Sequence, residues 1–344
     1  MTHRRSPFTR PSLDERGHTL VELMIALVLG LVLVGGVFVV FMGSRMSFNT
    51  SDNLSRMQDS ARIAFALMSR EIREASGTGC GNGGRADNGI ARRNRSVLNA
   101  AQSATPAWWS QIGAGIQGFD ASQVTPAIAI GTALGQRRSN TDALHLAGAY
   151  GAGFSVEMHN GTTNQFKLNT SQSGLTANDV LIVCDYRQST VFNASSVSGD
   201  RVNYAIGVGG HNNCGTAMAY DTGVVCPTTS YLYDPLVSRV SRFGASAWYI
   251  GNGSNGRPSL YRVFLDGGPE EIAAGVTDMQ ITYLADGSTA YVDASAVTDW
   301  ASVSSVRLTL SFESTDAAVS TASTGDRRLT TSTTSTIALR NRMP

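Results

Sequence analysis

One carboxylate, Glu22, lies at the head of the most apolar stretch of this 344-residue chain. No charged residue occurs in the stretch 23–44 that follows it. A carboxylate at the centre of a bilayer costs about 2.5–3.5 kcal/mol, and less near the interface. A plain membrane anchor gains nothing from this cost, so we expect Glu22 to form an ionic interaction with a functional purpose.

Disulfide formation is the second chemistry that the residue types allow. The four cysteines are Cys80, Cys184, Cys214 and Cys226. An even number in an exported chain favours disulfides, and no C-x-x-C pair supports the alternative of a zinc site. Four cysteines allow three pairings. Proximity in the sequence favours Cys214–Cys226, which leaves Cys80–Cys184 as the second bond.

The remaining reactive side chains form no known catalytic or metal-binding pattern. His145, His159 and His211 are isolated in the sequence, and neither H-E-x-x-H nor G-x-S-x-G occurs. The acidic loops at 266–271 and 286–287 do not have the spacing of a calcium loop, so we interpret them as hairpin turns. We therefore expect no catalytic, cofactor-binding or metal site, and we expect no enzymatic activity.

The stretch that follows Glu22 is long enough to cross a membrane. Residues 23–42 comprise 17 apolar residues and three glycines, and a helix needs about 20 such residues to span a bilayer core. We place the transmembrane segment at 23–44. Four arginines precede it, against Asp14 and Glu15, which predicts a cytoplasmic N-terminus and an exported remainder. A secretory signal peptide is the alternative, but no small-residue cleavage site follows the stretch.

Overall composition limits the classes of partner. Charged residues make up 15% of the chain and the formal net charge is +1. This balance excludes nucleic-acid binding driven by bulk charge. Low charge with abundant Gly, Ser, Thr and Asn is typical of an extracytoplasmic, β-rich protein.

The residues around Glu22 resemble a class III prepilin signal. Residues 16–23 read RGHTLVEL. The resemblance to type IV pilins and type II secretion pseudopilins implies that a prepilin peptidase cleaves between Gly17 and His18 and methylates the new amine of His18. Glu22 is then the fifth residue of the mature chain and pairs with the N-terminal ammonium of a neighbouring subunit. The family usually has an apolar residue where this chain has His18, a departure that bears on the efficiency of processing.

The helix is expected to continue beyond the membrane. Apolar residues recur at spacings of three and four in the order Leu54, Met57, Ala61, Phe65, Met68 and Ile72. This spacing predicts an amphipathic helix that ends near Gly77, so that one helix covers 18–76. Its second half should pack on a globular head.

The remainder of the chain divides into a glycine-rich region and a region of strands. We interpret 77–140 as an irregular insertion and 141–344 as the β-rich head. The insertion includes Trp108 and Trp109, which we interpret as packing residues, and a cluster of arginines at Arg85, Arg92, Arg93 and Arg95. The cluster could contact DNA, but Asp87 lies inside it and the mature chain is nearly neutral, so DNA binding is not expected. Strands are predicted at 142–148, 153–158, 178–186, 189–194, 236–243, 246–252, 258–266, 276–285, 304–314 and 335–341. A hairpin joins the sixth and seventh, and 314–336 is predicted as a loop.

Several stretches are similar to the PilW family of minor pilins. They lie at 180–192, at 275–314 and at the closing ALRNRMP of 338–344. The resemblance implies an α+β, pilin-like fold with a long N-terminal helix on an antiparallel sheet, after a leader at 1–17. It implies a non-enzymatic subunit that primes pilus assembly, lies at or near the pilus tip and supports adhesion and twitching motility. We expect the closing Arg340, Asn341 and Arg342 to be a surface or interface element.

The resemblance also implies partners and a location. The expected partners are other minor pilins, the major pilin, the prepilin peptidase, the inner membrane and a PilY-type tip adhesin; nucleic acid is not expected. The chain would cross the inner membrane once, with a periplasmic head, before entering the pilus. Three alternatives stay open: a J-type minor pseudopilin of type II secretion, a pilus-associated adhesin or DNA-uptake subunit, and a membrane-anchored enzyme.

Overall fold

The computed structural model describes the following residues: 19–80, 93–102, 107–111, 114–208, 210–219, 226–265, 267–320 and 325–342. The chain divides into two compact units, residues 1–52 and 53–344. Gly17 and His18 lie outside the described residues, as do Arg85, Arg92 and Asp266.

Helix α1 (Leu20–Glu74) confirms the long helix that the sequence predicts. It contributes to both units. Its buried residues are Asn53, Met57, Ala64, Met68 and Ile72, so they form one stripe at helical spacing. All of them lie in the second unit. The apolar residues of the first unit have no such burial.

The head is built mainly from antiparallel strands, as expected. In the described residues the larger sheet has 11 strands, and only the pair β1–β6 is parallel. Its strands are β1 (Arg93–Ser96), β2 (Ile116–Phe119), β3 (Ala143–Asn160), β4 (Gln165–Leu168), β5 (Val180–Cys184), β6 (Gln188–Asn193), β7 (Ser196–Ser198), β8 (Arg201–Asn203), β9 (Arg239–Asn252), β10 (Pro258–Phe264) and β11 (Pro269–Ala274). The expected insertion at 77–140 thus supplies two strands of this sheet, β1 and β2. It also includes the short helices α2 (Asn99–Gln102) and η1 (Trp108–Gln111).

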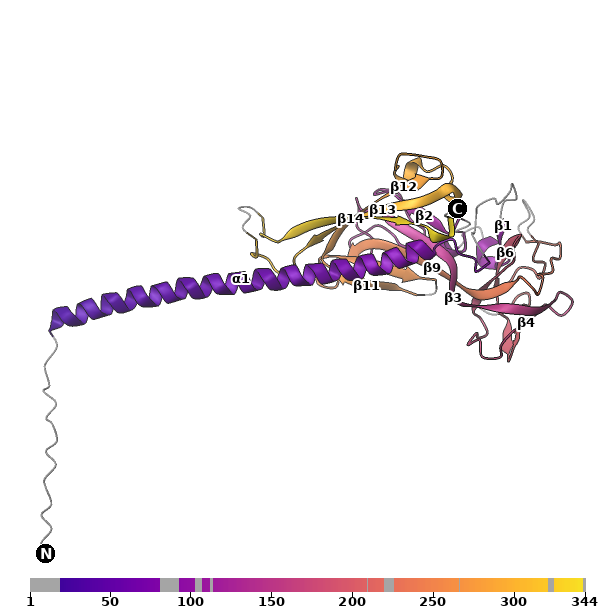
Figure 1. The fold of residues 1–344 in the computed structure, drawn as a ribbon, viewed down its shortest axis with the longest axis horizontal. Helices are drawn as coiled ribbons and strands as arrows, with labels where there is room; N and C mark the ends of the chain where they lie inside the picture. The colour runs from indigo at the N-terminus through magenta and orange to yellow at the C-terminus, as the bar shows by residue number, and fades with distance from the viewer. Residues whose placement is uncertain are drawn as a thin grey trace, which may run out of the picture. The chain divides into compact units, whose positions relative to one another are not determined.

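A smaller sheet has the order β12 (Val276–Ala285), β13 (Val303–Glu313) and β14 (Thr330–Ala338). The short helices η2 (Ala294–Ala296) and η3 (Trp300–Ser302) connect β12 to β13, and η4 (Arg340–Arg342) follows β14. Figure 1 shows the orange and yellow strands of this sheet beside the C-terminal part of α1.

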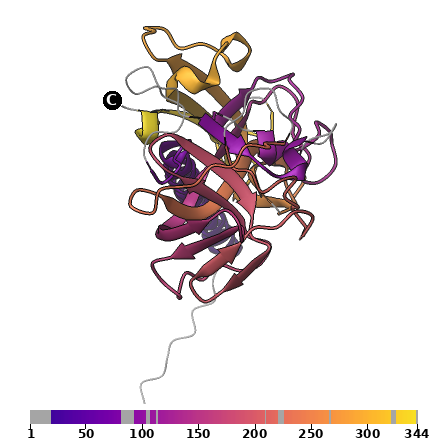
Figure 2. The same cartoon turned by 90° about the vertical axis from the view of Figure 1, so that its right-hand side faces the viewer.

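The stripe of α1 packs into a core that both sheets share. Met68 lies in one cluster with Leu146 and Trp248 from the large sheet and Leu308 from the small one. Figure 2, which looks along the head, shows the end of α1 among the magenta and orange strands. Burial of this apolar surface is the main force that holds the helix to the head.

Two pairs of predicted strands are each one continuous strand. The predictions at 142–148 and 153–158 are both part of β3, and those at 236–243 and 246–252 are both part of β9. The residues between the predicted strands, among them Gly151 and Gly244, lie inside the observed strands. In β3 the register with β9 shifts between Tyr150 and Phe154, and Gly151 there has φ +74°. Such a bulge lets a strand bend without ending.

Two other predictions were wrong about where strands lie. The loop predicted at 314–336 ends early, because β14 begins at Thr330 and pairs with β13 along its whole length. Glu270 and Glu271, interpreted as part of a turn, belong to strand β11. Threonine is β-branched and favours strands when a neighbouring strand is available, a condition that composition alone does not reveal.

Candidate assembly interface

The first unit presents an apolar helix surface. Leu20, Leu33 and Phe48 are 77%, 70% and 72% exposed, and the apolar residues between them are exposed to a similar degree. By length and composition, α1 is the one helix among the described residues that could cross a membrane. Exposed apolar area of this extent marks a membrane or protein interface.

Glu22 lies in the first turn of this helix. Its backbone N–H donates to Oγ1 of Thr19 over 3.3 Å. Thr19 is therefore the N-cap, and the spacing from Thr19 to Glu22 is that of a capping box. A carboxylate here also interacts favourably with the helix dipole. This local role was not predicted, although the T-x-x-E spacing from Thr19 to Glu22 is present in the sequence.

In the second unit, polar anchors fix α1 beside its apolar stripe. The carboxylate of Glu71 accepts hydrogen bonds from Oγ of Ser246 (2.6 Å) and Nε1 of Trp248 (2.7 Å). It also accepts one from Nη1 of Arg262 at 3.1 Å. Arg262 in turn pairs with Glu270 of β11 at 3.2 Å. Glu71 thus links the helix to β9, β10 and β11 through side chains that point at one carboxylate.

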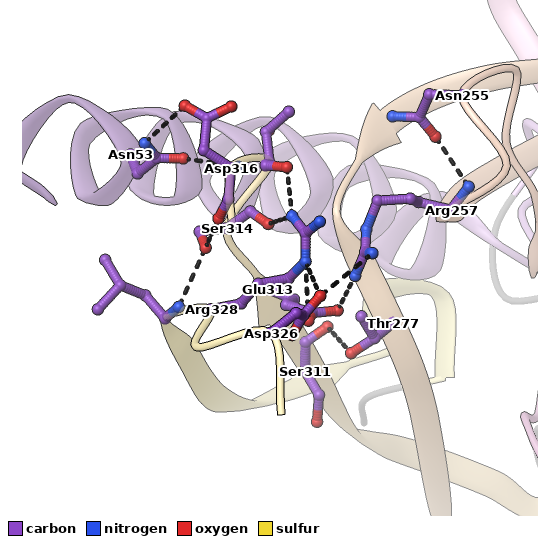
Figure 3. Close-up of polar contacts among 12 residues, drawn as sticks. Asn53, Asn255, Arg257, Thr277, Ser311, Glu313, Ser314, Asp316, Asp326 and Arg328 are labelled. Carbon is purple, nitrogen blue, oxygen red and sulfur yellow. Dashed lines mark hydrogen bonds and ion pairs between the residues drawn. The ribbon is translucent and has the colours of Figure 1, made fainter. Parts of the chain in front are cut away.

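At the other end of the buried stripe, Asn53 and Asp316 form a reciprocal pair, which we call the Asn53 clasp (Figure 3). Nδ2 of Asn53 donates to Oδ2 of Asp316 over 2.9 Å, and the backbone N–H of Asp316 donates to Oδ1 of Asn53 over 3.1 Å. Asn53 is only 1% exposed. A buried amide with no hydrogen-bond partner costs about 1–3 kcal/mol, so the pair fixes the position of this helix turn against the loop.

Charged side chains hold the loop that carries Asp316. Arg328 bonds the backbone carbonyls of Ser314 (2.8 Å) and Thr315, and its Nε lies 2.5 Å from Asp326. Arg257 from β9–β10 pairs with Glu313 in the same network, as Figure 3 shows. Arg328 therefore holds the two ends of the loop together, and Arg257 links its start to the turn between β9 and β10.

The end of the chain caps the end of α1. Nδ2 of Asn341 donates to the carbonyl oxygens of Glu74 (3.0 Å) and Ala75 (3.2 Å), two acceptors at the point where the helix stops. The guanidinium of Arg342 bonds Oγ of Ser76 at 2.8 Å and is 3% exposed. Burial lowers the pKa of Arg342 to about 10. The sequence predicted a surface or interface element at 340–342, but Arg342 is buried and so is not a surface residue.

Both disulfides have the pairing that proximity favoured. Cys80 is bonded to Cys184, and Cys214 to Cys226. The first bond joins the segment after α1 to the end of β5, across 104 positions of the sequence. In the chain-entropy model a loop of about 100 residues corresponds to about 4–5 kcal/mol of stabilisation.

The histidines and tryptophans singled out in the sequence are packing residues. His145 lies between the rings of Trp108 (5.1 Å) and Phe119 (4.6 Å), and burial lowers its pKa to about 3. His159 stacks on Phe166, and burial lowers its pKa to about 4. Across the part of the chain that the structure describes, no group of three His, Cys, Asp or Glu residues is placed to hold a metal ion.

Family comparisons define the class of the protein. Residues 13–38 match the family model of the prokaryotic N-terminal methylation motif, and residues 247–341 match that of the type IV pilus-assembly protein W, PilW. No curated protein and no solved structure matches the chain. The motif and the long apolar helix define a membrane-anchored protein of the prepilin type, related to type IV pilins. The match over its C-terminal region confirms the resemblance to the PilW family noted from the sequence.

The PilW match coincides with the elements that hold α1. Residues 247–341 include most of the anchors described above, among them Trp248, Arg262, Asp316 and Asn341. Most of the large sheet, from β1 to β8, lies outside both matched ranges.

Proposed function

We propose that this chain is a structural, non-enzymatic minor pilin that helps to prime assembly of a type IV pilus at or near its tip. The observation that carries the proposal is the combination of a methylation motif at 13–38 with a helix whose first half exposes its apolar surface. The PilW match covers most of the elements that anchor the second half of α1. This match supports a pilin in preference to a J-type pseudopilin.

In the proposed maturation, the prepilin peptidase cleaves between Gly17 and His18 and methylates the amine of His18. The chain begins with its leader in the cytoplasm and its head in the periplasm, and it crosses the inner membrane once. After cleavage, Glu22 lies four residues from the new ammonium of its own chain and is available to the ammonium of a neighbour. Removing one partner of a buried ion pair costs about 3–5 kcal/mol, which is enough to select the register of packed helices.

The tip position rests on the size of the head. A head of nearly 300 residues, with β1 and β2 added by 77–140, is bulky for regular packing along a filament. The partners proposed are other minor pilins, the major pilin and, at the tip, a PilY-type adhesin. Quantification of subunits in sheared pili tests this position: we expect a trace amount, and abundance equal to that of the major pilin would contradict it.

The decisive experiment concerns the N-terminus. The full chain is extracted from membranes of cells with and without the prepilin peptidase, and its intact mass and N-terminal sequence are measured. We expect a chain that starts at His18, with one added methyl group, only when the peptidase is present. A leader retained in both strains would show an ordinary anchored protein and overturn the proposal.

A further inference from the structure

Most sheet edges in the described part of the head are short, charged or covered. β1, β2 and β7 are only three or four residues long, and β11 begins with Pro269 and carries Glu270 and Glu271. The outer edge of β12 is occupied, because Asp142 bonds Met279 through its backbone N–H (2.9 Å) and Ile281 through its carboxylate (2.7 Å). These are the usual devices by which proteins prevent unwanted strand pairing.

The edge of β14 has none of these devices. The strand is nine residues long, with the sequence TTSTTSTIA, and contains no charge and no proline. Its register with β13 runs from Glu313–Thr330 to Ser305–Ala338 without a bulge. Eight of its nine residues are exposed or partly exposed, among them Thr331 and Thr333, whose side chains share the face of β13 that packs on the core.

The ladder shows which backbone groups of β14 point outward. The N–H of Ser314 donates to the carbonyl of Leu329, and the N–H of Leu339 donates to the carbonyl of Ser304, both at 2.9 Å. Bonded and non-bonded pairs alternate along an antiparallel ladder, so the odd-numbered residues of β14 face β13. The residues that direct N–H and C=O to the open edge are Thr330, Ser332, Thr334, Thr336 and Ala338. No described backbone group bonds to them.

We infer that the open edge of β14 is a docking site for an extended, uncharged strand from the head of a neighbouring pilin-type subunit. Main-chain hydrogen bonds to alternate residues would supply the affinity, as in other cases of strand addition. A charged strand would place its charged side chains beside the hydroxyl and apolar groups of β14, which carry no opposite charge to pair with them. The edge therefore favours a strand of hydroxyl-bearing and β-branched residues.

The position of β14 in the head supports a pilin-type subunit as the occupant, and in this respect the inference rests on the proposed function. The first residue of β14 lies opposite Glu313 of β13. Three residues after Glu313, Asp316 forms the clasp with Asn53, the first buried residue of α1. A neighbour that contacts α1 at this turn would bring its own head alongside this end of the sheet. Helix packing and strand addition would then be parts of one continuous interface.

The test uses the full chain in cells that assemble pili. A photo-reactive phenylalanine analogue replaces Thr336, whose backbone faces the open edge, and the cross-linked peptides are identified by mass spectrometry. We expect a cross-link to an extended segment in the head of another pilin-type subunit. A cross-link only to lipid, to the peptidase or to a non-pilin protein overturns the inference.

Substitutions at Thr334 test how much an outward backbone N–H of β14 contributes to binding of the neighbouring strand. Thr334→Pro removes an outward N–H without removing a bond to β13, and proline is tolerated on strand edges in this position. Thr334→Val is the matched control, because both variants lose the hydroxyl contact with Thr309 (2.8 Å) but valine keeps the N–H. We expect Thr334→Pro to lower the yield of the cross-link about tenfold and Thr334→Val to leave it unchanged. Equal yields would overturn the inference.

A second variant guards against misfolding. Ser332→Lys keeps every backbone group and adds a charge of the kind that protects natural edges, so it should lower the yield as Thr334→Pro does. Glu22→Ala separates the two proposals. If it abolishes incorporation into pili while both edge variants incorporate and cross-link normally, the edge inference fails and the proposed function stands. If the wild-type chain itself is absent from sheared pili, the proposed function fails.

Discussion

The two halves of helix α1 differ in whether their side chains are buried and hydrogen-bonded within the chain itself. In the first unit, apolar side chains such as Leu33 and Val34 are about 70% exposed, and polar side chains are few. In the second unit, Met68 and Ile72 are fully buried, and Glu71 accepts three hydrogen bonds from the head. One continuous helix thus combines a surface that needs an external partner with a surface that the chain itself has satisfied.

This difference raises the question of which parts of the head anchor the second half of the helix. Most of the anchors of the second half come from the range that matches the PilW family. The unmatched strands β1–β8 contribute to the shared core mainly through β2 and β3. The matched region is therefore the part of the head that supplies most of the contacts with the second half of the helix.

The largest effect is expected where the first half meets its neighbours. Glu22→Ala should lower incorporation into sheared pili by a hundredfold or more, because an unpaired buried charge costs about 3–5 kcal/mol. Glu22→Gln should lower it similarly, although glutamine can still take part in a capping box with Thr19. Immunoblots of sheared pili would measure both. Wild-type incorporation of the glutamine variant would show that Glu22 acts only as a helix cap.

A pair of truncations contrasts the two halves directly. Met68→Ala should lower the free energy of unfolding of the head by about 2–5 kcal/mol, because it leaves a cavity in the core. Val34→Ala, in the exposed half, should change it by less than about 0.5 kcal/mol. Urea unfolding of the detergent-extracted full chain would compare them. Equal losses of unfolding free energy in the two variants would contradict the division of the helix into a half that packs on the head and a half that does not.

The Asn53 clasp lies where the half of α1 that packs on the head begins. Asn53→Ala should cost about 1–3 kcal/mol, because it leaves Asp316 without its side-chain partner. Hydrogen exchange should then rise in the first turns after residue 53 and in the loop around Asp316, but not near Met68. The exposed Ser51→Ala is the control, for which no change is expected.

The smallest effect concerns pH. The pKa of His145 is lowered by burial to about 3 from an ordinary value near 6.5, so the unfolded chain binds a proton that the folded chain does not. Its contribution is present above pH 6.5 and is lost as the pH falls, by at most about 2 kcal/mol at pH 5. Asp142, whose pKa burial raises to about 6, acts in the opposite direction.

His145→Leu tests this sign. The variant should flatten the fall in thermal midpoint between pH 6.5 and 5, and it also removes a buried Nε2 that has no hydrogen-bond partner. His211→Leu is the comparison. A pH profile of His145→Leu identical to the wild type would show that His145 is not the source of the acid sensitivity.

Local patterns predicted the helix, its buried stripe and most of the strands. The spacing of Met57, Met68 and Ile72 is a property of neighbours on one helix, so it is visible in the sequence. The strand predicted at 335–341 starts too late, and the first five residues of β14 were missed because these serines and threonines form a strand only when β13 is beside them. The capping role of Asn341 was missed because its acceptors, the carbonyls of Glu74 and Ala75, lie 267 and 266 positions away.

The sequence by itself determined that this chain has a membrane-length helix, a carboxylate at its head, an amphipathic continuation and cysteines suited to two disulfides. These features depend on composition and on short-range periodicity. Only the tertiary structure decided that Asp316 meets Asn53 across 263 positions, that Arg342 is buried under the end of α1 and that the edge of β14 is open. The partner of a polar side chain or of a strand edge depends on how distant segments come together, and short-range patterns in the sequence do not record that arrangement.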